Sequence, residues 1–182
     1  MPPTPSTTTG PLAAARSLES AAVLDRLAAV VDRLSGAVVP AGRAHHALRG
    51  RSLGHPLHAV LTDLPLGLWS SAVALDLTGP EKYADASRRL VGLGLLTAVP
   101  TVLAGLADFP ALGTRARRVA AVHAAVNGVG NVLFATSFLA RHAGRRRLGA
   151  ALSVAGMGVA GAGGFLGGHV AGGMHEPAPP TA

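Results

Sequence analysis

Six side chains capable of acid–base or ligand chemistry stand at or just inside the ends of four long apolar segments. They are four histidines and two aspartates: His55, His58, His123, His169, Asp63 and Asp108. Neutral imidazoles on facing helices are a common way to hold haem iron, and the same nitrogens bind divalent metals. Ionisable groups inside an apolar segment are costly, so each one is a candidate functional residue.

A further polar stripe runs along the third apolar segment. His123, Asn127 and Asn131 are spaced by four residues and therefore share one helical face, which is too polar to lie against lipid. We expect this face to point into the protein. Asp63, Asp108 and Asn127 are then the candidate hydrogen-bond partners of the histidine ligands. The alternative is that these groups only bond to one another between helices or lie at the headgroup level.

The elements that position these residues are four predicted membrane-spanning helices, at about 57–78, 90–107, 119–140 and 148–170. The segments Leu90–Ala107 and Leu148–Val170 contain no charged residue. A helix rises about 1.5 Å per residue, so roughly 20 such residues cross the bilayer core. Short links make neighbouring helices antiparallel, which predicts an all-α, up-down four-helix bundle. In that bundle all six residues gather at the end that carries the termini.

Composition agrees with a multi-pass membrane protein. Of 182 residues, 49% are apolar and 14% are charged, against about 25% charged in an ordinary soluble domain. The net charge of +7 comes from arginines that cluster in the links, a pattern typical of lipid headgroups rather than of nucleic-acid binding. The chain has no cysteine, which excludes disulfides and thiolate ligands. No catalytic motif is evident, and an enzymatic activity is not predicted.

The chain divides into four predicted parts: a disordered stretch over 1–17, an amphipathic helix with a basic linker over 18–50, the membrane domain over 51–172, and a flexible tail over 173–182. The amphipathic helix, Leu18–Leu34, places its leucines on one face and its charges on another. It is too charged to span a bilayer. Two placements stay open, at the lipid interface or packed on the membrane domain.

Glycines dominate the fourth segment. Gly163/Gly167 and Gly164/Gly168 form two small-xxx-small pairs, which let helix backbones approach closely in lipid. Three interpretations remain: packing inside one bundle, a homodimer through this face, or room beside a planar cofactor.

Several motifs resemble a bacterial family of four-helix integral membrane proteins, the domain of unknown function 2231. They are GHPLHAVLTDLPLGLWSSAVALDLTG (54–79), GLAD (105–108), HAAVN (123–127) and FLGGHV (165–170). The resemblance implies a multi-pass protein of the bacterial inner or plasma membrane, without an assigned activity. The family's recurrent histidines match His55, His58, His123 and His169. Some relatives resemble fusions to a C-terminal Rieske iron–sulfur domain, which we expect to be absent from this cysteine-free chain, so a separate soluble redox partner is implied.

Three functional hypotheses follow. The first is a redox module that holds haem b or a divalent metal with the histidines named above. The second is a non-catalytic anchor that binds partner proteins. The third is a proton- or ion-conducting element lined by Asp63 and the polar stripe of the third segment, although no inverted repeat is evident in the sequence.

Overall fold

The computed structural model describes residues 10–39, 41–79 and 81–174, and every regular element within them is helical, with no strand. The predicted disorder of residues 1–9 and the predicted flexibility of 175–182 fall outside the described residues. Four helices are long and apolar enough to cross a membrane: α4 (Leu57–Thr78), α5 (Ala84–Asp108), α6 (Thr114–His142) and α7 (Arg146–Gly173). The predicted all-α membrane bundle is therefore confirmed.

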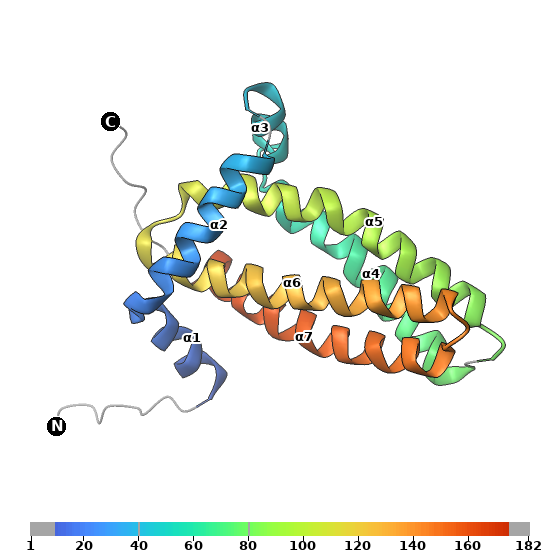
Figure 1. Ribbon diagram of the computed structural model, residues 1–182. Coiled ribbons are helices and arrows are strands. Elements are labelled where there is room, and N and C mark those ends of the chain that lie inside the picture. Colours follow the sequence, from blue (N-terminus) through green and yellow to red (C-terminus); the bar gives the residue numbers. More distant parts are fainter. Residues whose placement is uncertain (1–9, 40, 80, 175–182) are drawn as a thin grey trace.

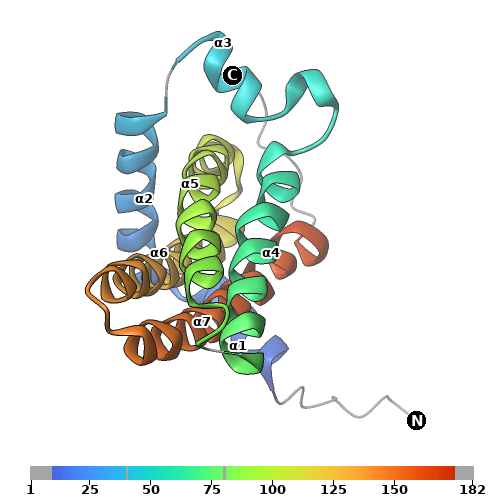
Figure 2. The same cartoon turned by 90° about the vertical axis from the view of Figure 1, so that its right-hand side faces the viewer.

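These helices form two antiparallel hairpins, α4/α5 and α6/α7 (Figure 1). Packing is most extensive within each hairpin, and α5 and α6 supply much of the contact between them. Viewed nearly along the bundle, each helix lies beside its hairpin partner (Figure 2). Helix α4 has the predicted bounds, whereas α5, α6 and α7 begin earlier than the apolar segments, because the polar residues that precede each segment are also helical.

The bundle is built for a lipid surrounding. Its fully buried positions are mostly small, as at Ala72, Ala104 and Ala121. Large apolar side chains instead cover the outside, and Leu77 and Leu96 are 73% and 68% exposed. Small interior residues let backbones approach closely where no hydrophobic effect drives helices together. The outer apolar surface is what the bilayer core covers.

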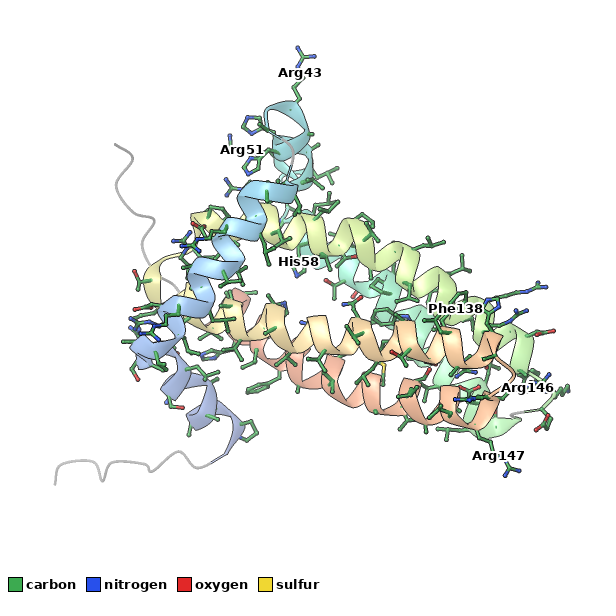
Figure 3. All side chains as sticks on the ribbon, in the orientation of Figure 1. Arg43, Arg51, His58, Phe138, Arg146 and Arg147 are labelled. Atoms are coloured by element: carbon green, nitrogen blue, oxygen red, sulfur yellow. The ribbon has the colours of Figure 1, made fainter. Side chains whose placement is uncertain are left out.

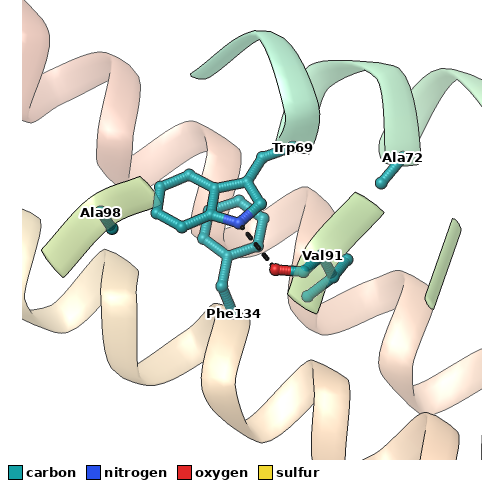
Figure 4. Close-up of a cluster of buried hydrophobic side chains, with 5 residues drawn as sticks. All are labelled: Trp69, Ala72, Val91, Ala98 and Phe134. Atoms are coloured by element: carbon teal, nitrogen blue, oxygen red, sulfur yellow. Dashed lines mark hydrogen bonds between the residues drawn. The ribbon is translucent and has the colours of Figure 1, made fainter. Parts of the chain in front are cut away.

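An aromatic pair fills the middle of the bundle. The rings of Trp69 on α4 and Phe134 on α6 stack with centroids 4.0 Å apart and planes 8° apart. The indole N–H of Trp69 donates to the carbonyl oxygen of Val91 at 3.3 Å (Figure 4). Each hairpin contributes one ring, so this stacked pair joins the two hairpins.

Proline inside α4 leaves a carbonyl that another helix satisfies. Pro65 has no N–H to donate to Leu61, so the Leu61 oxygen loses its helical partner. The Thr101 hydroxyl of α5 lies 3.2 Å from that oxygen and donates to it. This bond ties α4 to α5 near the end of the bundle that carries the histidines.

An N-terminal arm of two helices crosses that same end. It consists of α1 (Pro11–Ser20), the 3-10 turn η1 (Ala22–Leu24) and α2 (Asp25–Val38), and it is followed by the short helix α3 (Arg43–Leu48). The predicted disorder over 1–17 is wrong for residues 11–17. Pro11 begins a helix in which Ala15 and Glu19 are buried, so tertiary contact orders a stretch whose composition alone does not.

The amphipathic helix predicted as one element is interrupted at Ala21, and its second half packs on the bundle. Val31 of α2 lies in a cluster with Phe109 and Ala121. The Ser35 hydroxyl donates to the carbonyl oxygen of Leu106 at 2.7 Å. Leu34, next to Ser35 on α2, stays 51% exposed.

Candidate functional site

Two of the four candidate histidines meet between the hairpins. His58 is the second residue of α4 and His123 lies inside α6, and their ring centroids are 6.0 Å apart with planes at 85°. Figure 3 shows His58 between the two hairpins, near the end that α2 crosses. The edge of one imidazole therefore faces the other across the hairpin interface.

The ring of His58 is held by α5. Its Nδ1 lies 2.9 Å from the carbonyl oxygen of Thr101. Gly105 leaves the room for this ring, because a Cβ at that position would lie 2.9 Å from Nδ1. Since a carbonyl oxygen only accepts, Nδ1 carries the proton and donates it.

The ring of His123 is held in the same manner by α7. Its Nδ1 lies 2.8 Å from the carbonyl oxygen of Gly163. A Cβ at Gly167 would lie 2.7 Å from Cε1 of the ring. This bond again assigns a proton to Nδ1, so in the neutral form of either ring Nε2 is the unprotonated nitrogen.

Asn127 is a polar side chain close to the His123 ring. It lies one turn after His123, and its Nδ2 is 3.0 Å from the His123 carbonyl oxygen, 3.2 Å from the ring Nδ1 and 3.3 Å from the ring Nε2. The Asn131 amide donates to the Asn127 carbonyl oxygen at 2.8 Å. The predicted inward polar stripe of α6 thus reaches the histidine pair at Asn127.

His169 and His55 lie elsewhere. Nε2 of His169 is 2.8 Å from Oε1 of Glu19, and both side chains are less than a tenth exposed. His55 is exposed, and its Nδ1 has a long 3.4 Å contact to the oxygen of the adjacent Pro56. The four histidines share one end of the bundle, but only His58 and His123 approach each other.

The two aspartates are also apart from the imidazole pair. Asp108 accepts a hydrogen bond from Nε of Arg49 at 3.3 Å, which joins α5 to the segment after α3. Asp63 is exposed on the outside of α4. Their predicted role as partners of the histidines stays a prediction. Within the described ranges no three histidine, cysteine, aspartate or glutamate side chains are grouped as a metal would need.

Ion pairs attach the N-terminal arm beside this site. Three acids of the arm each contact one arginine of the first turns of α6: Glu19 with Arg115, Asp25 with Arg118, and Asp32 with Arg117. The hydrogen bond from His169 lowers the pKa of Glu19, burial opposes it, and Arg115 lowers it further. The Arg118 guanidinium likewise lowers the pKa of Asp25. Both carboxylates are therefore held in their charged form.

Sequence reasoning missed the groups that hold the two rings. Thr101 and Gly163 act through backbone oxygens, which no side-chain pattern reveals. Gly105 and Gly167 matter because they lack a Cβ, and the small-xxx-small pair Gly163/Gly167 was the only signal that pointed to this face. Gly164 and Gly168 face outward with open space around them, and the homodimer through them stays a prediction.

The fold and the site define a four-helix membrane protein in which two hairpins face each other through a histidine pair. The family of predicted membrane proteins DUF2231 matches residues 54–175, which include all four spanning helices, and the chain belongs to that family. No curated protein and no solved structure matches the chain.

Proposed function

We propose that this protein is a redox module of the bacterial cell membrane that binds a metal centre between its two hairpins, with His58 and His123 as the two protein ligands. The centre is haem iron or a bare transition-metal ion, which share the need for unprotonated imidazole nitrogen. A soluble redox partner would exchange electrons with it at the end that carries the arm. Family membership supports the membrane location only.

The observation that carries this proposal is the hydrogen bonding of the two rings. Each Nδ1–H donates to a backbone oxygen, at 2.9 Å for His58 and 2.8 Å for His123. Metal-ligating histidines almost always donate their other ring N–H in this way, which fixes the ring and its tautomer. Nε2 of each ring is then the nitrogen that a metal would take, and at His123 the metal would replace the contact from the Asn127 amide.

The number of ligands favours haem over a bare ion. The protein offers two imidazoles at this point, whereas zinc sites take three or four protein ligands. Haem iron needs fewer protein ligands, because the porphyrin would supply the others. The ring centres of His58 and His123 are 6.0 Å apart, close enough for both side chains to reach one bound group.

The site would have to widen to take a porphyrin. Both rings pack tightly against Gly105 and Gly167, so no plane fits behind them. The porphyrin would lie between the hairpins, and these would have to separate at this end. A bare ion needs no such movement. The two forms of the proposal therefore differ in whether ligand uptake changes the distance between α4 and α6.

The test is expression of the full chain with and without added haem precursor, purification in a mild detergent, a visible spectrum and metal analysis. We expect a Soret band for haem, or stoichiometric metal without that band for a bare ion. His58→Gln and His123→Gln should each lose the ligand, while the exposed His55→Gln should retain it. A colourless, metal-free protein would contradict the proposal and leave a non-catalytic anchor as the function to pursue.

Asn127 supplies a second readout. Its amide is 3.3 Å from the nitrogen of His123 that the metal would take, so the two compete. Asn127→Ala should therefore bind the ligand more tightly than the parent chain. Asn131→Ala is the matched control one turn further along, because it removes an amide that donates only to the backbone.

A further inference from the structure

We infer that the membrane domain is two copies of one helical hairpin related by a two-fold axis along the bundle, and that His58 and His123 are equivalent positions facing each other across that axis. Both hairpins begin at the same end of the bundle, so the repeat is parallel rather than inverted. The repeat has two consequences. The one for ligand binding rests on the proposed function, whereas the one for the exchange of Trp69 and Phe134 does not.

A single register relates α4 to α6. The shift that carries His58 to His123 also carries Trp69 to Phe134. The same shift carries Asp76 to Arg141, and Thr62 to Asn127. In each pair the two residues occupy matching positions in the two hairpins, and only the histidine pair keeps its residue type.

A second register relates α5 to α7. The shift that carries Gly94 to Gly156 also carries Gly105 to Gly167, so both pairs of glycines keep the same spacing. Their contacts are equivalent as well. Gly94 and Gly156 leave room for the aromatic ring of their own hairpin, and Gly105 and Gly167 leave room for its histidine.

The hydrogen bonds within each hairpin repeat in the same registers. His58 donates to the oxygen of Thr101, and His123 donates to the oxygen of Gly163, the position equivalent to Thr101. One turn further along, Thr62 and Asn127 each donate a side-chain hydrogen to the carbonyl oxygen of the histidine that precedes them. Local packing and bonding thus follow one plan in both hairpins.

Contacts between the hairpins join equivalent positions in three layers. His58 faces His123 at the arm end, Trp69 stacks on Phe134 in the middle, and Asp76 pairs with Arg141 at the opposite end. Only residues on a two-fold axis meet their own equivalents. Three such layers along the bundle place the axis through the histidine pair.

A ligand on this axis must present two equivalent faces to the two imidazoles. A haem iron or a metal ion held by both imidazoles would satisfy this condition, and a site that needs unlike ligands on its two sides would not. Under the proposed function, both His58 and His123 are therefore required for binding.

The repeat is tested without any ligand by exchanging the aromatic pair in the full chain. Trp69→Phe combined with Phe134→Trp restores one tryptophan, as in the parent, which has a single one. If the positions are equivalent, Gly156 accommodates the indole as Gly94 does now. We expect the fluorescence emission maximum and melting temperature in detergent to match the parent, with Trp69→Phe alone melting lower.

The matched control combines Trp69→Phe with Phe138→Trp, which places the indole one turn further along α6, at a partly buried position beside the Trp69–Phe134 cluster. We expect that control to melt no higher than Trp69→Phe alone and to emit at longer wavelength. The inference is overturned if the exchanged chain behaves like this control, or if it fails to accumulate in membranes where Trp69→Phe alone accumulates.

The second experiment measures ligand binding and compares His58→Met with His123→Met. A loss of affinity is expected in both variants, because both histidines are ligands at equivalent positions. A loss in only one of the two variants overturns the equivalence of the two histidines. Absence of any ligand contradicts the proposed function and leaves the aromatic exchange to decide the repeat.

Discussion

The two ends of the bundle join the same pair of helices with different chemistry. At the arm end α4 meets α6 through two imidazoles, each bonded to its own hairpin. At the opposite end α4 meets α6 through Asp76 and Arg141, which bond to each other. The first contact leaves Nε2 of His58 without a hydrogen-bond partner among the described residues, and the second uses nearly all of its donors and acceptors.

The Asp76–Arg141 layer is a closed network. The guanidinium contacts both carboxylate oxygens, and its side chain is 3% exposed. Ser137 and Ser153 accept further hydrogen bonds from it. A buried charge with every partner in place is costly to disturb, so this end sets the register of the two hairpins.

The contrast assigns different roles to the two ends. An ion pair with its partners satisfied has no capacity left for a ligand, whereas an imidazole whose Nδ1 is fixed by a backbone oxygen presents Nε2 to whatever enters. We therefore expect substitutions at the Asp76 end to change stability, and substitutions at the His58 end to change binding.

The largest expected effect tests whether the Asp76–Arg141 layer holds the two hairpins together. Arg141→Leu leaves Asp76 buried without a counter-charge and should destabilise the protein by about 3–5 kcal/mol. Adding Asp76→Leu removes the stranded charge and should recover most of that loss. Reversible unfolding in mixed detergent micelles measures both. If Arg141→Leu is as stable as the parent, the two ends do not differ as argued.

A smaller effect is expected where the arm end is tightly packed. Gly167→Ala places a Cβ 2.7 Å from the His123 ring, and overpacking of this kind costs about 1–3 kcal/mol. Gly164→Ala is the matched control on the same helix, with open space around its Cβ. That control should gain up to about 1 kcal/mol from helix propensity. The same unfolding assay compares the two, and equal effects would argue against a packed ring at Gly167.

The attachment of the arm should depend on pH. The pKa of Glu19 is lowered in the folded protein, chiefly by the His169 hydrogen bond. Its contribution to stability is thus present above the ordinary pKa of glutamate and is lost as pH falls through the lowered value. Nitroxide labels at Arg26→Cys and Val132→Cys, in a chain with no other cysteine, report the arm-to-bundle distance. We expect the distribution of this distance to broaden in acid.

Glu19→Gln provides the control for that measurement. It removes the titrating carboxylate, so the arm should be looser at neutral pH and show a smaller acid step. An unchanged acid step in Glu19→Gln would assign the pH dependence to another group of the arm, with Asp25 the first to test, since the pKa of that carboxyl is also lowered.

The spanning helices could be predicted from sequence because lipid imposes a simple rule. Long apolar segments must be helical, and short links must reverse the chain, so α4 to α7 followed from hydropathy alone. The arm could not be predicted equally well. The helix over Pro11–Ser20 depends on contacts with α6 that are distant in sequence, as the pair of Glu19 and Arg115 illustrates.

The site was predictable in part for a related reason. His58 and His123 stood out as polar residues in apolar segments, and depth along the helices placed them at one end. The direction in which each side chain points depends on helix rotation. The rotation of each helix about its axis brings His58 and His123 together, places His169 beside Glu19, and leaves Asp63 on the outer surface. A parallel repeat escaped notice because the hairpins share spacing more than residue types.

The smallest expected effect concerns how the arm is joined to the histidine end. The Ser35 hydroxyl is buried and donates to the Leu106 oxygen, so Ser35→Ala should cost about 0.5–1.5 kcal/mol. Ser17→Ala is the control, because that exposed hydroxyl bonds only within α1. Because Leu106 adjoins Gly105, which backs the His58 ring, Ser35→Ala should also weaken ligand binding slightly if the arm steadies the site. A loss of stability with no change in binding would confine the arm to a structural role and sharpen the contrast between the two ends.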